Sequence, residues 1–491
     1  LPLATQAAGA VLSYVKTHQK DAISSIKTLR TYSIDEFMLI DQQTRRNLEL
    51  FAGGKWDTKQ TSLFSVLDQT KTSMGSRMLK KWISQPLIDI KKIIDRQNVI
   101  TTLLINYIET EKIIEILKGI SDLERLSTKL IRGKASPRDL LGISKSLKNS
   151  KEMKKMLSEI NNDSDIEWLL SKFKETEFIC NLIDSSISDT APIVPGDGRT
   201  IKSGFSQNLD TIRENSTTAK EYMVSMESLE KTRTGIKSLK IGHNKVFGYY
   251  IEVSKSNLNS IPPEYIRKQT LVGGERFITP EMKEHEVEIL NAQEQMNDIE
   301  ITIFNQICSQ ISSSVKILFE ISLGIALTDV FCSLSSVAKE KEYTKPEITI
   351  GEEITIIEGR HPVAETILGI EKFIPNDSLL DNKNNQILLI TGPNMSGKST
   401  YLKQVGIITL MAQIGSYVPA KKAEIGVVDR IFTRVGLQDD LTVGQSTFMV
   451  EMIETAYILN QATKNSLIIL RNTRSMILLN FWEKKTTHIA I

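Results

Sequence analysis

Residues 392–400 read Gly-Pro-Asn-Met-Ser-Gly-Lys-Ser-Thr, which matches the pattern G-x-x-x-x-G-K-[ST] of a phosphate-binding loop. An apolar run at 386–390 before the loop predicts a buried parallel strand, and 399–416 predict a helix. Backbone N–H groups in such a loop and the positive end of the helix dipole attract anions. In this pattern Lys398 reaches the β- and γ-phosphates and the Ser399 hydroxyl coordinates Mg²⁺. The stretch therefore predicts a nucleoside triphosphate site in an α/β domain.

Length and composition limit the class of protein. The chain has 491 residues, enough for about three domains, and is 40% hydrophobic and 24% charged, as soluble globular proteins are. No apolar run approaches the roughly 20 residues that span a bilayer, and no signal peptide is recognisable, so we expect a cytoplasmic protein. The net charge is +2, so a nucleic-acid surface would have to be local. The three cysteines show no metal-ligand spacing.

The periodicity of apolar residues divides the chain into regions. From Leu12 to about Asp184 and again from 280 to 318, apolar residues recur every three or four positions and predict helices. Between them, 239–255 alternate with period two and predict strands joined at 242–245. From Ile348 onward the pattern is α/β, with strands expected near 354–357, 386–390, 425–435 and 466–470.

Several motifs together resemble the MutS family of DNA mismatch-recognition ATPases. The Pro-Asn-Met insert makes 392–400 more specific than a bare phosphate loop. In the α/β region the other similar stretches are Glu358-Gly-Arg-His-Pro362, Gly415-Ser-Tyr-Val-Pro-Ala420 and Asp439-Asp-Leu-Thr-Val-Gly-Gln-Ser-Thr-Phe-Met-Val-Glu-Met452. Elsewhere they are Leu67-Asp-Gln-Thr-Lys-Thr-Ser-Met-Gly-Ser-Arg77, Trp82-Ile-Ser-Gln-Pro86, Asp122-Leu-Glu-Arg125, Pro137-Arg-Asp-Leu140, Gly248-Tyr-Tyr-Ile251, Arg267-Lys-Gln-Thr270 and Glu275-Arg276. The resemblance covers residues 1–470 almost without a gap.

The resemblance implies a multidomain fold. We expect a mainly α lever or core domain with an inserted small β-rich clamp, followed by a truncated α/β P-loop ATPase domain. The expected ranges are 1–12 for the end of a connector domain, 13–221 and 284–341 for the lever, 222–283 for the clamp, 342–470 for the incomplete ATPase domain and 471–491 for a non-family tail. The family works as a dimer on double-stranded DNA, with ATP or ADP governing mismatch binding, sliding and release, and it acts with a MutL-type partner.

The resemblance also assigns a nucleotide site. Phe373 would stack on adenine, although a plain core phenylalanine is the alternative. Ser399 would hold Mg²⁺, and Ser446 and Thr447 would belong to the site of the opposite subunit, whereas composition alone indicates a helix N-cap there. The expected phosphate-loop residues are Gly392, Pro393, Asn394, Met395, Ser396, Gly397, Lys398, Ser399 and Thr400.

The clamp region carries the candidate DNA contacts. Lysine, arginine and amide side chains can neutralise and hydrogen-bond phosphates without reading sequence. Glu252, Glu264, Glu275 and Glu281 dilute the charge, so a merely solvated surface is the alternative. The expected contact residues are Asn244, Lys245, Lys255, Arg267, Lys268, Gln269 and Thr270.

Two parts of the family pattern are absent. The mismatch-reading domain, with its Phe-x-Glu motif, would precede Leu1, and we interpret Phe173-Lys-Glu175 in the helical region as coincidence. After Leu470 the Walker B pair Asp-Glu is replaced by Arg471 and Asn472, and nothing beyond matches, as after a shift of reading frame. We therefore expect no intact catalytic residue, hydrolysis slower by roughly 10²–10⁴-fold, and a sheet without its remaining strands.

Three functions stay open. The first is a piece of a prokaryotic mismatch-repair ATPase that lacks the N-terminal mismatch-binding domain and everything from Walker B onward. The second is a non-enzymatic DNA-binding remnant with a vestigial nucleotide site, and the third is a paralogue for recombination intermediates. The motif at 439–452 is more similar to the repair branch, which favours the first. His488 resembles a later Thr-His motif of the family but comes too soon after 466–470, so we treat it as incidental.

Overall fold

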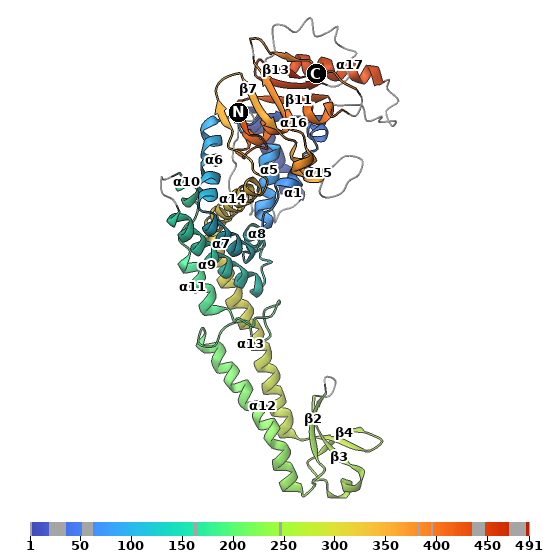
Figure 1. Ribbon diagram of the computed structural model, residues 1–491. Helices are drawn as coiled ribbons and strands as arrows, with labels where there is room; N and C mark the ends of the chain where they lie inside the picture. The colour runs from blue at the N-terminus through green and yellow to red at the C-terminus, as the bar shows by residue number, and fades with distance from the viewer. Residues whose placement is uncertain are drawn as a thin grey trace. The chain divides into compact units, whose positions relative to one another are not determined.

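The computed structural model divides into two compact units (Figure 1). Unit 1 comprises Leu1–Glu124, Asn149–Lys174 and Leu318–Ile491, and unit 2 comprises Arg125–Lys148 and Glu175–Ile317. The described part of the chain is mostly helical, with three small sheets. The structure describes residues 2–18, 36–51, 62–160, 165–244, 248–381, 383–393, 396–434, 447–470 and 488–490.

The helices confirm the helical regions of the sequence. Ser314 separates two helices where one was expected over 280–318. Ser313 bonds its own helix backbone through Oγ to the Gln310 carbonyl, and consecutive serines favour a helix end. The helices are α1 (Pro2–His18), α3 (Gln42–Asn47), α4 (Leu63–Leu67), α5 (Ser73–Ser84), α6 (Ile90–Ile105), α7 (Tyr107–Lys118), α8 (Leu123–Ile131), α9 (Pro137–Glu159), α10 (Glu167–Leu170), α11 (Glu177–Ser186), α12 (Gln207–Thr234), α13 (Pro280–Ser313), α14 (Val315–Glu340), α15 (Pro362–Leu368), α16 (Lys398–Gln413) and α17 (Thr447–Gln461).

Helix α14 supplies much of the core of unit 1. Phe331 is fully buried, and its ring lies 5.3 Å from that of Trp82 and 5.9 Å from that of Trp168. By length and composition α14 is the one helix in the described residues that could cross a membrane, although the sequence pattern indicated no run of that length. Because 78% of its most apolar window is buried inside the protein, α14 has the pattern of a core helix.

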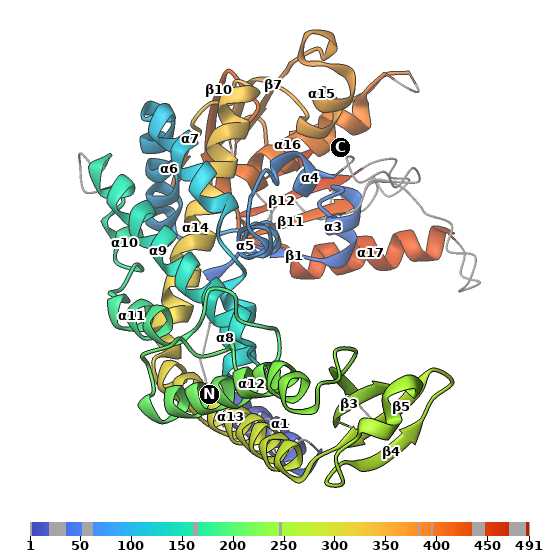
Figure 2. The ribbon, with the colours of Figure 1, turned by 90° about the horizontal axis from the view of Figure 1, so that it is seen from below.

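A five-stranded parallel sheet lies in unit 1. Its order is β1 (Leu39–Ile40), β11 (Arg430–Arg434), β12 (Ser466–Leu470), β13 (His488–Ala490) and β9 (Ile387–Leu388). Alternate residues of β12 face opposite sides, so Ile469 lies near Gly406 of α16 while Ile468 and Leu470 pack with Ile458 of α17. Figure 2 shows α16 and α17 on the two sides of β11 and β12. Helix α16 follows strand β9 in the chain and packs against β12 of the same sheet.

Two strands of this sheet correct the sequence analysis. Leu39–Ile40, in a region expected to be helical, pairs in parallel with β11. The sheet was expected to lack its remaining strands beyond Leu470, but His488–Ala490 forms β13 between β12 and β9. His488 therefore lies in an inner strand of the sheet. Strands of two or three residues are too short to show a period of two, so sequence pattern alone could not find them.

A second sheet in unit 1 has four strands. Its order is β6 (Glu347–Thr349), β10 (Lys422–Gly426), β7 (Ile354–Gly359) and β8 (Asn376–Leu380). The single strand expected over 425–435 is in fact two strands, β10 and β11, in different sheets. Helix α16 contacts β7 of this sheet as well as β12 of the other. It is thus packed from two directions, which fixes it in the core of the unit.

In unit 2, α12 and α13 lie side by side and carry a small antiparallel sheet near one end (Figure 1). The strand order is β2 (Lys240–Asn244), β3 (Gly248–Ser254), β5 (Gly274–Ile278) and β4 (Ile266–Thr270), with a 3₁₀ turn η2 (Lys255–Ser260) after β3. Met223 of α12 and Met282 of α13 pack with Phe277 in one apolar cluster. The strands expected over 239–255 are confirmed, but 242–244 belong to β2 and the connection lies later, outside the described residues.

A buried carboxylate fixes the loop that follows α11. Glu300 of α13 is fully buried and accepts hydrogen bonds from the backbone N–H groups of Gly198 at 2.9 Å and Thr200 at 3.0 Å. The Arg213 guanidinium of α12 donates to the same carboxylate at 2.9 Å. A buried charge is tolerated only when it is paired and hydrogen-bonded, as it is here. Glu300 thereby ties α12, α13 and the loop together.

Candidate functional site

The phosphate-binding loop ends at an uncapped helix N-terminus. Gly397 precedes α16 with φ at +90°, a left-handed conformation that favours glycine, and no side chain of the described residues caps the helix. The first intrahelical hydrogen bond is donated by Tyr401 to the Gly397 carbonyl, so the N–H groups of 398–400 lack a helical acceptor. A Cβ added at Gly397 would meet nothing within 4 Å, so the space beside it is open. The loop therefore fits a phosphate group.

Lys398 lies folded over the loop. Its ammonium donates to the carbonyl oxygens of Gly392 and Pro393, each at 2.6 Å. A Cβ on Gly392 would stand 3.2 Å from Ser396 Oγ, so a small residue suits this turn. A bound phosphate would exchange the two carbonyl acceptors of Lys398 for phosphate oxygens. Ser399 and Thr400 lie half-buried in the first turn of α16, and Asn394 and Met395 lie outside the described residues.

The other predicted nucleotide contacts are placed less completely. Phe373 follows the 3₁₀ turn η3 (Ile370–Lys372) and is half-buried, while its neighbour Ile374 is 81% exposed. Adenine stacking by Phe373 stays a prediction. Thr447 is the first residue of α17. The side chain of Thr447 and all of Ser446 lie outside the described part, so both the N-cap and the nucleotide contact stay predictions.

Few carboxylates are available for a metal ion. In the part of the chain that the structure describes, no group of three His, Cys, Asp or Glu residues could hold one. Strand β12 ends at Leu470, and Arg471 and Asn472 lie outside the described residues. Strand β11 ends at the buried Arg434, whose Nε lies 3.3 Å from Glu454 of α17. Ser399 is the one predicted Mg²⁺ ligand that the structure places at the loop.

The motif at 358–362 builds a buried ionic network, a role that the sequence did not reveal. Arg360 Nε donates to Glu365 at 2.8 Å, and the Tyr343 hydroxyl donates to the same carboxylate at 2.6 Å. Burial and this carboxylate raise the pKa of Tyr343 well above its ordinary value. A second nitrogen of Arg360 donates to the Lys341 carbonyl at 2.8 Å. The network joins the end of α14 to α15.

His361 of the same motif caps α15. Its Nδ1 accepts a hydrogen bond from the Ala364 N–H at 3.2 Å, which requires an unprotonated nitrogen. Burial, with a smaller contribution from nearby Lys403, lowers the pKa of His361 from 6.5 to about 4. The imidazole is therefore neutral at physiological pH and acts as a structural cap.

Helix α16 contains two buried glutamines of opposite character. Gln413 donates to the carbonyls of Leu87 at 2.8 Å and Val428 at 2.9 Å, and accepts from the Val428 N–H at 3.0 Å. Gln404 is fully buried, yet within the described residues neither its amide nitrogen nor its oxygen has a hydrogen-bond partner. Sequence gives no signal for this difference, because it depends on which backbone groups of distant segments lie opposite each side chain.

The candidate DNA-contacting residues lie on or beside the small sheet of unit 2. Arg267 pairs with Glu275 at 3.2 Å, and Arg276 pairs with Glu252 at 3.1 Å, so acidic residues neutralise part of the surface. The Arg276 guanidinium also donates to Gln269 at 3.1 Å. Asn244 ends β2, Lys255 begins η2, and Lys268 and Thr270 are exposed on β4, whereas Lys245 lies outside the described residues.

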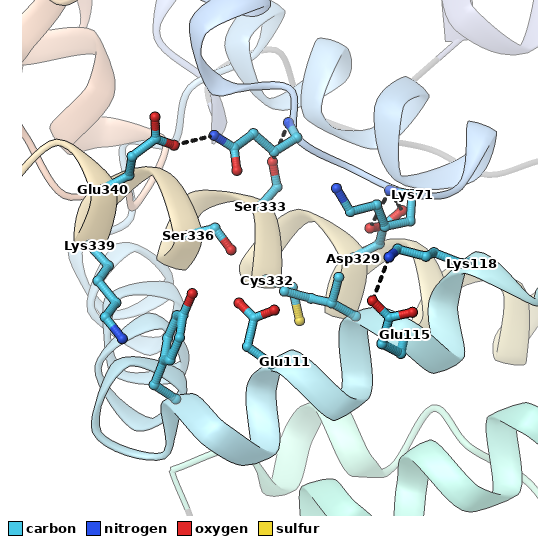
Figure 3. A pocket seen from close by; sticks show the side chains of 13 residues that line it. Lys71, Glu111, Glu115, Lys118, Asp329, Cys332, Ser333, Ser336, Lys339 and Glu340 are labelled. Carbon is cyan, nitrogen blue, oxygen red and sulfur yellow. Dashed lines mark hydrogen bonds and ion pairs between the residues drawn. The ribbon is translucent and has the colours of Figure 1, made fainter.

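A polar cavity of about 560 Å³ lies in unit 1 between α7, α14 and the stretch before α5 (Figure 3). Asp329 of α14 accepts from the N–H groups of Lys71 at 2.9 Å and Thr72 at 2.7 Å, and so binds the N-terminal end of α5. A Cβ on Gly75 would lie 2.3 Å from this carboxylate. The Lys339 ammonium lies over the Tyr107 ring. The contacts of Asp329 with the stretch before α5 and of Lys339 with Tyr107 of α7 hold the three segments together.

Comparison with known proteins identifies relatives along most of the chain. A family model described as MutS domain III matches residues 43–335, and one described as MutS domain V matches 388–473. The DNA mismatch repair protein MutS of Acetivibrio thermocellus is 46% identical over 464 residues, 94% of this chain and 53% of that protein. The protein of the same name from Halothermothrix orenii is 47% identical over 469 residues, 96% of this chain and 52% of that protein. The chain spans about half the length of the curated relatives it matches.

The buried state of His361 predicts a pH dependence of stability. Because folding lowers the pKa of His361, the neutral imidazole contributes to the free energy of unfolding. This contribution is fully present above pH 6.5 and is lost as the pH falls through about 4. The loss amounts to about 3 kcal/mol. Urea unfolding gives the free energy of unfolding of the protein and of His361→Asn, whose cap does not titrate, at several pH values. Between pH 7 and pH 4 this free energy should fall more steeply in the protein than in the variant. The same change of unfolding free energy with pH in both proteins would contradict the assignment of His361 as a buried neutral cap.

The unpartnered amide of Gln404 predicts a stabilising substitution. Gln404→Met keeps the size of the side chain and removes a buried polar group without partners, so it should raise the free energy of unfolding by about 1 kcal/mol. Gln413→Met is the matched control on the same helix, and should lower it by about 2 kcal/mol because three hydrogen bonds are lost. Chemical denaturation of both variants gives the comparison. Equal destabilisation by the two would show that Gln404 has a polar partner.

Proposed function

The chain belongs to the MutS family, and on that premise we propose that it is part of a DNA mismatch repair protein that binds double-stranded DNA under the control of a nucleotide. The observation that carries the proposal is the phosphate loop at the uncapped end of α16. Like other proteins that hold triphosphates at such a loop, this one offers backbone N–H groups and one lysine to the phosphates.

The nucleotide we propose is ATP or ADP. Lys398 and the first-turn N–H groups of α16 would bind its phosphates, and Phe373 would stack on the adenine. A Mg²⁺ ion usually keeps several waters and is held by few protein groups together with phosphate oxygens. The Ser399 hydroxyl would supply the protein's ligand to that ion, and Ser446 and Thr447 would serve the site of a second subunit.

Hydrolysis should be slow in this chain. Arg471 and Asn472 stand where the family has two carboxylates, and neither side chain can act as a general base at neutral pH. We infer that turnover is reduced by roughly 10²–10⁴-fold, which is the usual contribution of such a base. This replacement also favours the second candidate function, a non-enzymatic DNA-binding remnant. Measured ATP turnover separates the two.

The DNA contact we propose is made by the small sheet of unit 2 as a clamp domain over residues 222–283. Exposed Lys255 and Lys268 would bind phosphates irrespective of base sequence. The other domain boundaries that we propose are those expected from the sequence. They are a connector end at 1–12, a lever at 13–221 and 284–341, an ATPase domain at 342–470 and a tail at 471–491. A dimer that slides on DNA, a MutL-type partner and a cytoplasmic location belong to the same proposal.

Replacement of Lys398 tests the nucleotide site. Lys398→Ala should weaken ADP binding at least about tenfold, because it removes the ammonium that folds over the loop. Equilibrium dialysis with labelled ADP and Mg²⁺ gives the affinity, and ATP turnover is read from the same samples. Lys422→Ala, at an exposed position of β10, is the control and should bind as the parent does. If the parent, Lys398→Ala and Lys422→Ala bind ADP equally well, the loop is not part of the nucleotide site.

Charge reversal on the small sheet tests the DNA contact. Lys255→Glu with Lys268→Glu should weaken binding to a duplex of any sequence and reduce the slope of log K against log salt by about 2. Fluorescence anisotropy of a labelled duplex at several salt concentrations measures both. Lys91→Glu with Lys112→Glu makes the same change of charge on exposed positions of α6 and α7. If both double variants lose affinity equally, the effect is one of net charge and the sheet makes no contact.

A further inference from the structure

Two motifs that the proposed function leaves without a role meet at Arg96 of α6. The guanidinium carbon of Arg96 lies 3.5 Å from the centre of the Trp82 ring, in the motif 82–86. Arg96 Nη1 donates to the Ile414 carbonyl at 2.8 Å, directly before the motif 415–420. Gly415 has φ at +84°, and a Cβ there would lie 2.5 Å from the Cβ of Arg96. Glycine is therefore required for the arginine to reach the carbonyl.

Arg96 binds the C-terminal end of the helix whose other end is the phosphate loop. The last carbonyls of a helix carry a partial negative charge, which a cation stabilises. Burial lowers the pKa of Arg96 to about 9, so the group is still charged at pH 7. The N–H of Leu87 donates to the Gln413 carbonyl at 3.0 Å and strengthens the same attachment. Residues before and within α6 thus hold this helix end.

Helix α16 is built to carry displacement from one end to the other. It is on the order of 24 Å long at its usual rise per residue. Leu402 and every residue from Gln404 to Gln413 are buried, and a close-packed interior deforms little under load. At the loop end, by contrast, Lys398 is held through two loop carbonyls, and the first N–H groups are open. A change at the open end therefore acts on the attachment at the closed end.

We propose that Arg96 is a positioning residue for the phosphate loop, acting through α16, so that a phosphate bound at the loop and the Arg96–Trp82 contact are energetically coupled. The inference rests on the proposed nucleotide site. It gives Trp82 and Gly415 a shared role, because Trp82 supports the guanidinium and Gly415 leaves room for it. Arg96 touches neither nucleotide nor metal, and acts by fixing where α16 begins.

The fluorescence of Trp82 gives a direct test. The chain has four tryptophans, and Trp56→Phe, Trp168→Phe and Trp482→Phe leave Trp82 alone as the reporter. ADP with Mg²⁺ is titrated into this protein while equilibrium dialysis measures binding in parallel. The emission of Trp82 should change with the midpoint found by dialysis. Lys398→Ala should shift both midpoints to an ADP concentration at least about tenfold higher.

Variants at Arg96 separate positioning from a purely structural role. Arg96→Met should remove the Trp82 response and weaken ADP binding by about 2- to 30-fold, the range expected for coupling through packed elements. Arg96→Lys retains the charge and should restore part of both. Lys91→Met, at an exposed position of the same helix, should change neither.

Three results would overturn the inference. Binding of ADP by dialysis without any change in Trp82 emission would do so and leave the nucleotide site intact. Unchanged affinity for ADP in a folded Arg96→Met variant would also overturn the inference and leave the nucleotide site intact. Absence of ADP binding in the parent protein would overturn both this inference and the proposed nucleotide site. If Arg96→Met does not fold, the Trp82 titration of the parent decides the question.

Discussion

The contrast between the two ends of α16 is the constraint on which unit 1 depends. A helix buried along its length must place its end groups somewhere, because unpaired backbone groups are costly away from water. The C-terminal end does so within the protein, because Arg96 donates to the Ile414 carbonyl and the Leu87 N–H donates to the Gln413 carbonyl. The N-terminal end has no capping side chain and opens into the loop at Gly397. The fold thus leaves open one end of a rigid element, where the proposed nucleotide would place its phosphates.

The same logic recurs in three buried carboxylates, each of which ties a helix to a segment distant in sequence. Asp329 of α14 binds the start of α5, Glu365 of α15 binds Arg360 and Tyr343, and Glu300 of α13 binds a loop after α11. A buried carboxylate adds little net stability, but removing its partners is costly, so each favours one arrangement of its neighbours. Burial raises the pKa of Asp329, while the Thr72 hydroxyl and the N–H groups of Lys71 and Thr72, just before α5, oppose that rise. These contacts account for residues such as Gly75 and Arg360 in motifs that the sequence could name but not explain.

The sequence predicted what depends on local pattern. The loop at 392–400, the helix after it, the strands near 354–357 and 466–470 and the small sheet around 239–255 were all found, because glycine spacing and apolar periodicity are local signals. It could not predict β1 or β13, which have two and three residues and exist through their partners in the sheet. Arg96 and Ile414 are joined by one hydrogen bond across 318 positions, and no periodicity reports such a contact. Lys245, Ser446, Arg471 and Asn472 lie outside the described residues, so their assignments stay predictions.

Strand β13 connects the phosphate loop to the rest of its sheet. Among the described strands, β9, which leads into the loop, pairs with β13, and β13 pairs in turn with β12. The position of the loop relative to α17 and β11 therefore depends on His488–Ala490, in a stretch without the family's sequence pattern. Backbone hydrogen bonds pair β13 with its neighbours, so this part of the sheet does not require particular side chains. Catalysis, by contrast, requires particular side chains. Under the proposed function, the loop would keep its phosphate-binding geometry although Arg471 and Asn472 replace the family's two carboxylates, and binding without efficient turnover would result.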